Sequence, residues 1–186
     1  MPGLLKETAT LKLLAIGTVL EVGIDRTARS RVRGLYIFVH ELTHAVAALA
    51  VGRTVTHFVS TLNGGFVAYR GEASQTPGNV AISLAPYVFP LLTILSVAAR
   101  PALSPDTLFW FDLWIRVTIS FHLLWTLRAI WKQYSSSPGE VTVGNGQSDI
   151  AKNGLLLSSL YILVVGLAIW GVIFAALLEG YSGALL

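Results

Sequence analysis

The strongest constraint on the fold is a pair of long stretches that carry no charged residue. Residues 155–178 read LLLSSLYILVVGLAIWGVIFAALL, and residues 80–99 likewise lack Asp, Glu, Lys and Arg. Each is about as long as the roughly 20 residues that an α-helix needs to cross a bilayer. The stretches 34–52 and 107–131 are similar in length, and 11–24 is a weaker fifth candidate. We therefore expect a mainly α-helical membrane protein, a polytopic bundle of about four to five transmembrane helices.

The composition supports this class and excludes others. Of the 186 residues, 54% are hydrophobic and only 12% are charged, which is typical of an integral membrane protein. The net charge of +3 is small and spread along the chain, so we expect the lipid bilayer and no nucleic acid as a partner. Because the chain has no cysteine, disulfides and thiolate ligands are excluded. Any metal must be held by nitrogen and oxygen.

The chain divides into two parts. Residues 1–33 are expected to form an N-terminal amphipathic or short spanning segment that ends in a cluster of arginines. Glu21 interrupts its apolar run and no clear cleavage pattern follows, so we do not expect a cleaved signal. Residues 34–186 are expected to form one membrane-embedded domain. A connection rich in Ser, Gly and Asn, at about 132–153, precedes the last helix.

A β-hairpin is predicted at about residues 54–72. β-branched and aromatic residues alternate loosely on either side of Asn63-Gly64-Gly65, which is a hairpin signal. Strands at membrane depth need protein or a wet cavity to satisfy their backbone groups, so we expect the hairpin to pack beside the helices at one interface. The two glycines either make the turn or permit close approach of another chain.

The distribution of positive charge leaves the topology open. The N-terminal arginine cluster and the pair Arg128 and Lys132 both favour the cytoplasmic side of the membrane. If every segment crossed once, the helix at 107–131 would instead end outside. Either the hairpin dips back through the interface, or the helix with Pro86 and Pro90 is broken and re-entrant.

The stretch 34–52 contains the motif HExxH, formed by His40, Glu41 and His44. On a helix, residues four apart lie one turn apart in nearly the same direction, so both imidazoles can bind one metal ion. Glu41 lies beside them and can act as the general base on a water that the metal activates. Because polar groups at membrane depth are costly, a metal site explains the motif better than two structural histidines do.

Two histidines do not complete a catalytic zinc site, which usually has three protein ligands and a water molecule. Four side chains are candidates for the third ligand: Asp112, His122, His57 and Asp149. Asp112 lies about as far into its helix as His40 does, but Arg116 four residues later suggests an ion pair instead. His57 falls in the hairpin, and Asp149 is placed as a helix N-cap would be. The residues alone leave the choice open.

Five blocks follow one another in a recognisable order: FVHELTHAVAALAVGR, NGGFVAYRG, SLAPYVFPLL, FHLL and QSDIAKNGLLLSS. Together, over roughly residues 34–178, they resemble the site-2-protease-like M50 metallopeptidases, in particular the small M50B-like members. The resemblance implies a membrane-embedded zinc protein whose HExxH lies on a core helix and whose third ligand is a later carboxylate. At the matching positions of this chain, the resemblance implies His40, His44 and Asp149 as zinc ligands and Glu41 as the catalytic base.

The resemblance also implies a function. We expect an intramembrane zinc metalloprotease that cleaves a membrane-bound or membrane-proximal protein or peptide, as a multi-pass protein of a prokaryotic cell membrane. In this family a strand edge near the site can pair with an unwound substrate segment, so Asn63, Gly64 and Gly65 are expected to contact substrate. His122 either hydrogen-bonds near the site or is a structural histidine. The oligomeric state is not indicated.

Two departures from the family pattern motivate an alternative. The better-studied site-2 proteases have Gly after the third ligand, where this chain has Ile150. They also have a Gly-Pro-x-x-Asn block that helps to hold substrate, whereas this chain has Ala85 and Phe89 at the Gly and Asn positions. The alternative is a non-catalytic zinc-binding membrane subunit or scaffold derived from the same family.

Overall fold

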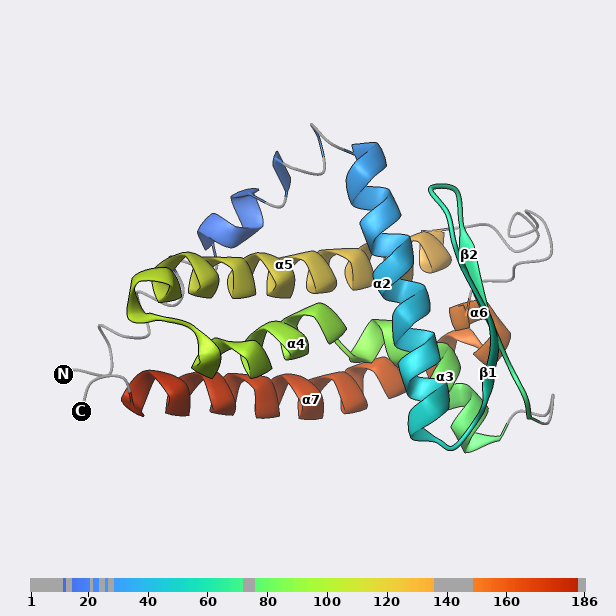
Figure 1. The fold of residues 1–186 in the computed structure, drawn as a ribbon. Helices are drawn as coiled ribbons and strands as arrows, with labels where there is room; N and C mark the ends of the chain where they lie inside the picture. The colour runs from blue at the N-terminus through green and yellow to red at the C-terminus, as the bar shows by residue number, and fades with distance from the viewer. Residues whose placement is uncertain are drawn as a thin grey trace.

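The computed structural model describes residues 29–71, 76–135 and 149–183, together with residues 12, 15–20, 22, 23 and 26. Much of the expected segment 1–33, and most of the expected connection 132–153, lie outside these residues. The main elements are, in order, α2 (Arg29–Ala50), β1 (Val55–Ser60), β2 (Gly65–Tyr69), α3 (Pro77–Val88), α4 (Leu91–Ala99), the 3-10 helix η1 (Arg100–Ala102), α5 (Pro105–Ser135), α6 (Asp149–Asn153) and α7 (Leu155–Gly183). The chain is thus mainly helical, with a hairpin after the HExxH helix, as expected (Figure 1).

Two of the described helices are long and apolar enough to cross a membrane. They are Asp106–Lys132 in α5 and Leu155–Leu177 in α7. A third crossing results if α3 and α4 together make one span. Helix α2 does not meet the same criterion, because its arginines and the ionisable residues of HExxH interrupt its apolar run. The structure therefore supports two or three spans, and the expected four to five are not confirmed.

The predicted helix at 80–99 is broken. Its two halves, α3 and α4, are bent by 68° relative to each other. The break falls at Phe89 and Pro90, and Pro90 has no backbone N–H with which to continue the α3 ladder. Phe89 closes α3 with a hydrogen bond from its backbone N–H to the carbonyl of Ala85, at 2.8 Å. Of the two topologies left open above, this geometry agrees with a broken helix.

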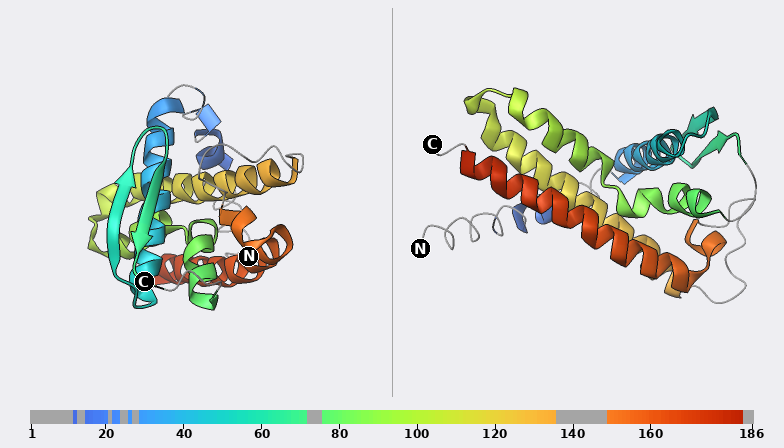
Figure 2. Two further views of the ribbon diagram at one scale, coloured as in Figure 1. Left: turned by 90° about the vertical axis from the view of Figure 1, so that its right-hand side faces the viewer. Right: turned by 90° about the horizontal axis from the view of Figure 1, so that it is seen from below.

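The helices form a layered bundle with α2 across one end. In Figure 1, α5 and α7 run in opposite directions with α4 between them, and α4 contacts both. Helix α2 crosses the end of this bundle and packs on α3. The hairpin lies along the outer side of α2, and Figure 2 shows the same order of layers from two further directions. Helix α2 is therefore covered by helices on one side and by the sheet on the other.

The hairpin is antiparallel and pairs Ser60 with Gly65 at its closed end. The backbone N–H of Thr61 donates to the carbonyl of Gly64 at 2.9 Å and closes the turn. The rings of Phe38 on α2 and Phe58 on β1 meet edge to face, with centroids 5.9 Å apart. This packing beside a helix agrees with the sequence-based expectation for the hairpin.

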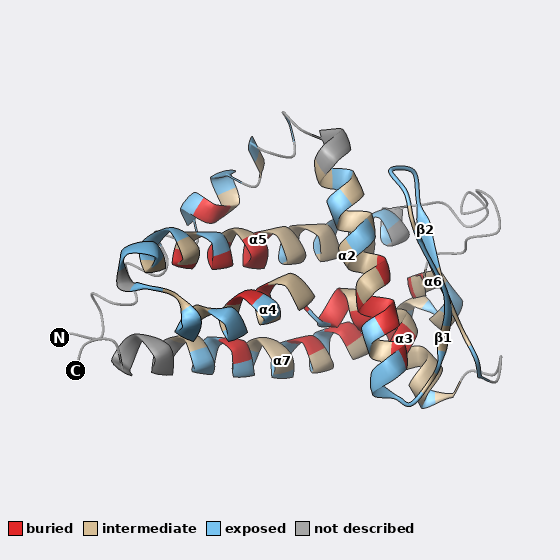
Figure 3. Cartoon of the chain, viewed as in Figure 1, coloured by how far each residue is buried: buried red, intermediate tan, exposed pale blue. Residues whose placement is uncertain are grey.

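A buried apolar cluster forms where α3, α6 and α7 meet. It contains Leu84, Tyr87, Val88, Ile150 and Ile162. Figure 3 shows buried residues concentrated on the facing sides of the helices, whereas much of α7 is exposed. Exposed leucines and valines along α7 fit a lipid-facing surface. Because Ile150 belongs to the cluster, this core fixes the position of its neighbour Asp149.

Candidate metal centre

The two histidines of HExxH and one distant carboxylate converge at a single point. The Nε2 atoms of His40 and His44 lie 3.2 Å apart. The Oδ2 atom of Asp149, which begins α6, lies 3.5 Å from the first and 3.2 Å from the second. Helix α2 presents both imidazoles on one face, and the packing of α6 against α3 and α7 brings the carboxylate to them.

The separation of these three atoms fits a tetrahedral metal ion. Bonds of about 2.0–2.1 Å in tetrahedral geometry place ligand atoms about 3.3–3.4 Å apart. The three observed separations lie between 3.2 and 3.5 Å. Two imidazole nitrogens and one carboxylate oxygen are also a donor set that suits zinc. The residues therefore fit the ion that the motif predicts.

Hydrogen bonds to the outer nitrogen atoms orient both rings. His44 Nδ1 lies 2.8 Å from the backbone carbonyl oxygen of Ile82, which can only accept, so Nδ1 carries the proton. The lone pair of neutral His44 is consequently on Nε2, which faces the cluster. His40 Nδ1 lies 3.3 Å from the hydroxyl of Tyr36, one turn earlier in α2. Both rings are thus held with Nε2 toward the same point.

The carboxylate of Asp149 is held through its second oxygen. Ser83 Oγ donates to Oδ1 at 3.4 Å, and Lys152 Nζ lies 3.5 Å from the same atom. Asn153 donates through Nδ2 to Ser83 Oγ and to the backbone carbonyl of Asp149. Burial by itself raises the pKa of the Asp149 carboxyl, but interaction with the two neighbouring histidine side chains lowers it, to well below its ordinary value. The group is therefore ionised, as a metal ligand must be.

A family model described as Peptidase M50B-like matches residues 9–137, which is more than half of the chain. The chain belongs to the M50B-like peptidase family. The comparisons with curated proteins and with solved structures returned no match. Membership in a membrane peptidase family, together with two helices able to span a bilayer, indicates a membrane protein of metallopeptidase type.

The matched region of this M50B-like chain contains HExxH and the hairpin but ends before Asp149. Two observations support Asp149 as the third ligand: its sequence block resembles that of the family, and its carboxylate lies beside the two histidines. Ile150, which departs from the family pattern, is 2% exposed and anchors α6 in the core. A bulky apolar residue at this position therefore has a structural role of its own.

An open cavity of about 330 Å³ adjoins the cluster on the side of Glu41. His40, Glu41 and Trp125 line it from the helices, and Asn63, Gly64 and Gly65 line it from the tip of the hairpin. Glu41 itself is only 8% exposed. The hairpin residues expected to contact substrate thus face the same space as the expected base.

Gly65 lies directly against Glu41. A Cβ atom at Gly65 would be 2.5 Å from Glu41 Cγ and 2.6 Å from the carbonyl oxygen of Val59. At Gly64 the same atom would meet nothing within 4 Å. Positive φ among the described glycines occurs only at Gly52 and Gly154. The backbone conformation of the turn therefore does not require a glycine at position 65. The closeness of Glu41 does require one, because it leaves no room for a side chain.

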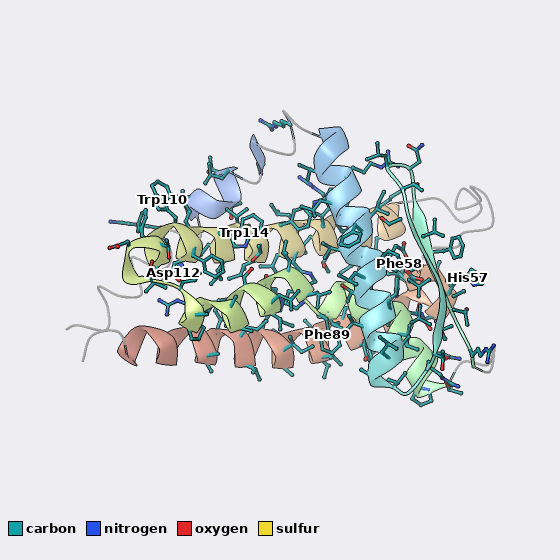
Figure 4. All side chains as sticks on the ribbon, viewed as in Figure 1. His57, Phe58, Phe89, Trp110, Asp112 and Trp114 are labelled. Atoms are coloured by element: carbon teal, nitrogen blue, oxygen red, sulfur yellow. The ribbon has the colours of Figure 1, made fainter. Side chains whose placement is uncertain are left out.

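Two of the other candidate ligands lie away from the cluster. Figure 4 places Asp112 near the opposite end of α5 from the hairpin, and His57 on the exposed side of β1. The predicted ion pair of Asp112 with Arg116 is wrong in its partner: Arg100 Nε donates to Asp112 Oδ1 at 2.7 Å. Arg116 instead donates to the backbone carbonyl of Asp112. A half-buried cation from η1 therefore neutralises this carboxylate.

His122 lies near the cluster without joining it. It lines a small cavity of about 30 Å³ together with His40, Thr43 and Phe89. Its Nε2 atom is buried and has no hydrogen-bond partner among the described residues. A polar cavity of this size can hold a water molecule, which would satisfy that nitrogen. This position is compatible with both readings of His122, as a residue that acts near the site and as a structural one.

Sequence reasoning missed the residues that orient the candidate ligands. Ile82 acts through its backbone carbonyl, and Ser83 and Asn153 act as hydrogen-bond partners of the Asp149 segment. Ser83 and Asn153 are common polar residues without a motif of their own. Arg33, which also lines the large cavity, was read only as part of the N-terminal basic cluster. Its spacing of eight residues from Glu41 is the signal that places it on the same side of α2.

Proposed function

We propose that this chain is an intramembrane zinc metalloprotease that hydrolyses peptide bonds of a membrane-bound or membrane-proximal protein. The observation that carries the proposal is the convergence of His40, His44 and Asp149 beside a buried glutamate that faces an open cavity. Family membership supports a peptidase, and the donor set supports zinc.

Each residue of the site has a distinct proposed role. His40, His44 and Asp149 would hold the ion. When bound, zinc supplies Lewis-acid chemistry, which polarises the scissile carbonyl and activates water. The Glu41 carboxylate takes the proton of the attacking water and later passes it to the leaving amide nitrogen. Its burial beside Gly65 holds the carboxylate in one position and restricts access of bulk water.

The hairpin tip is proposed to present the substrate. Asn63, Gly64 and Gly65 line the cavity without bulky side chains next to Glu41, so an extended peptide backbone can approach closely. Pairing with a strand edge satisfies the backbone groups of a peptide that has unwound at membrane depth. His122, which lines the small cavity together with His40, is proposed to bind a water molecule near the site.

The test is a comparison of the Glu41→Gln variant with the parent protein, in vesicles that contain a single-span peptide substrate. We expect stoichiometric zinc in both proteins, because Glu41 is not a ligand. Cleavage by Glu41→Gln should fall by at least about a hundredfold, as expected when a general base is lost. Equal cleavage by variant and parent would show that Glu41 is not the base.

The second candidate is a non-catalytic zinc-binding subunit or scaffold. Phe89 favours it: this side chain lines the small cavity beside His40, at the position where the family pattern has a substrate-holding Asn. On this reading His40→Ala lowers the unfolding temperature without changing the processing of any substrate. Cleavage by the parent protein that disappears in His40→Ala would exclude the scaffold.

A further inference from the structure

The large cavity beside Glu41 has a cation at its rim. Arg33, on α2, is exposed and lines the cavity. No carboxylate among the described residues forms an ion pair with it. Of the described residues that line the cavity, Glu41 alone is acidic, and it is largely buried. The guanidinium of Arg33 is therefore available to a group that enters from outside.

The neighbouring aromatic wall carries a second cation. Trp125 of α5 lines the same cavity and stacks on Tyr36 of α2, with ring centroids 4.0 Å apart. On Trp125 lies the guanidinium of Arg128, 5.6 Å from the ring centroid. A second arginine, from α5, thus lies against one of the aromatic residues that line the cavity. The positive charge of Arg33 at this low-dielectric opening attracts anionic groups.

The distance of Arg33 from the base defines where such a group would lie on a peptide. Arg33, Ile37 and Glu41 are spaced four residues apart and share one side of α2, so Arg33 lies about 12 Å along the axis from Glu41. An extended peptide advances about 3.3 Å per residue. Allowing for the reach of the arginine side chain, a group bound by Arg33 belongs to a residue two to four positions from the scissile bond.

From these observations we infer that the cavity selects substrates with a carboxylate two to four residues from the cleaved bond, and that Arg33 recognises it. The carboxylate is an Asp or Glu side chain or the C-terminus of the peptide, since both offer the same two oxygens to a guanidinium. This inference depends on the proposed protease function, because it takes the cavity as the substrate cleft.

The test measures binding as well as cleavage, in vesicles of neutral lipid. Fluorescent single-span peptides carry Glu, Gln or Lys three residues from the cleavage site, each with a free or an amidated C-terminus. Binding is measured with zinc-loaded Glu41→Gln and cleavage with the parent protein. We expect the Glu peptide to bind about fivefold more tightly than the Gln peptide, less so at high salt. Weaker binding of all three peptides on amidation, with the Glu and Gln peptides bound alike, would assign the carboxylate to the C-terminus.

Three further variants, each made in the Glu41→Gln background, test whether Arg33 is the residue that binds the substrate carboxylate. Arg33→Gln should reduce the ratio of Glu to Gln affinities to about one, and Arg33→Glu should make the Lys peptide the preferred one. Arg70→Gln, an exposed arginine of the hairpin base that does not line the cavity, should keep the ratio. With Arg33 intact, a ratio of Glu to Gln affinities near one together with no effect of amidation overturns the inference. An equal loss of affinity for all peptides in Arg33→Gln, amidated peptides included, overturns it as well. Absence of any cleavage by the zinc-loaded parent overturns the protease function instead, while the binding ratio still tests Arg33.

Discussion

At the scale of single residues, the site depends on one contact that leaves no room for a side chain. Gly65 places its backbone against Glu41, and a Cβ there would come within 2.6 Å of both the glutamate and the Val59 carbonyl oxygen. Gly64 has open space around it. Two neighbouring glycines that look equivalent in the sequence therefore have different physical requirements.

Replacing Gly65 with Ala should displace Glu41, because the carbonyl oxygen of Val59 is backbone and cannot easily move. We expect the rate of peptide cleavage to fall by about tenfold or more while zinc content stays stoichiometric, since misplacement of a catalytic group by about 1 Å has effects of this size. The matched variant is Gly64→Ala, whose added carbon meets no atom and which should lose much less. A loss in Gly64→Ala as large as in Gly65→Ala would contradict this account.

At the scale of elements, the short helix α6 carries the carboxylate that is proposed as the third ligand. It begins at Asp149, is anchored by Ile150 in the core, and is separated from α7 by Gly154. Gly154 has φ of +81°, in the left-handed region that side chains rarely adopt. The backbone N–H of Gly154 donates to the carbonyl of Ala151, at 3.2 Å, and closes this turn. The turn at Gly154 sets the direction of α6 relative to α7, and hence the direction of the Asp149 carboxylate.

Gly154→Ala should lower the free energy of unfolding by about 1 kcal/mol, because alanine is strained at positive φ. The control is Gly166→Ala, in the middle of α7, where an added Cβ meets nothing within 4 Å. That change should be neutral or stabilising by up to about 1 kcal/mol, since alanine is the better helix former. Unfolding in detergent micelles, followed by far-UV circular dichroism, measures both. Equal stability of the two variants would argue against the strained turn.

At the scale of the whole molecule, the proposed metal joins parts that are distant in the chain. His40 and His44 belong to α2 and Asp149 to α6, and the ion would link the helix that crosses the bundle end to the core formed by α3, α6 and α7. An ion that binds only the folded state adds stability by mass action, about 2.7 kcal/mol when present at 100 times its Kd.

Chelation of zinc should therefore lower the unfolding temperature of the parent protein. Asp149→Ala should lose stoichiometric zinc and respond little to chelation. Asp112→Ala should keep its zinc even though it removes the partner of Arg100, because Asp112 lies near the other end of α5. Metal analysis of the purified proteins, with thermal unfolding before and after chelation, measures each expectation. Retention of zinc by Asp149→Ala with loss in Asp112→Ala would move the third ligand to Asp112.

Several elements could be predicted from the sequence because their signals are local. The apolar stretches 107–131 and 155–178 correspond to α5 and α7, and the alternating residues around the glycines correspond to the hairpin. For the stretch 80–99 the sequence left open whether the helix is broken at its prolines; it bends at Pro90, where a missing N–H allows a break that packing then determines. The hydropathy pattern also predicted that α2 spans the membrane. It is helical, but it is too polar to meet the criterion for a membrane span.

The sequence by itself determined the helical class, the hairpin and the HExxH pair, because periodicity, turn chemistry and a spacing of four residues act within one segment. Only the tertiary structure decided that the Asp149 carboxylate meets the two histidines while Asp112 pairs with Arg100. It also decided that Gly65, rather than Gly64, lies against Glu41. These are contacts between segments far apart in the chain, and their geometry follows from how the helices pack, which no local pattern encodes.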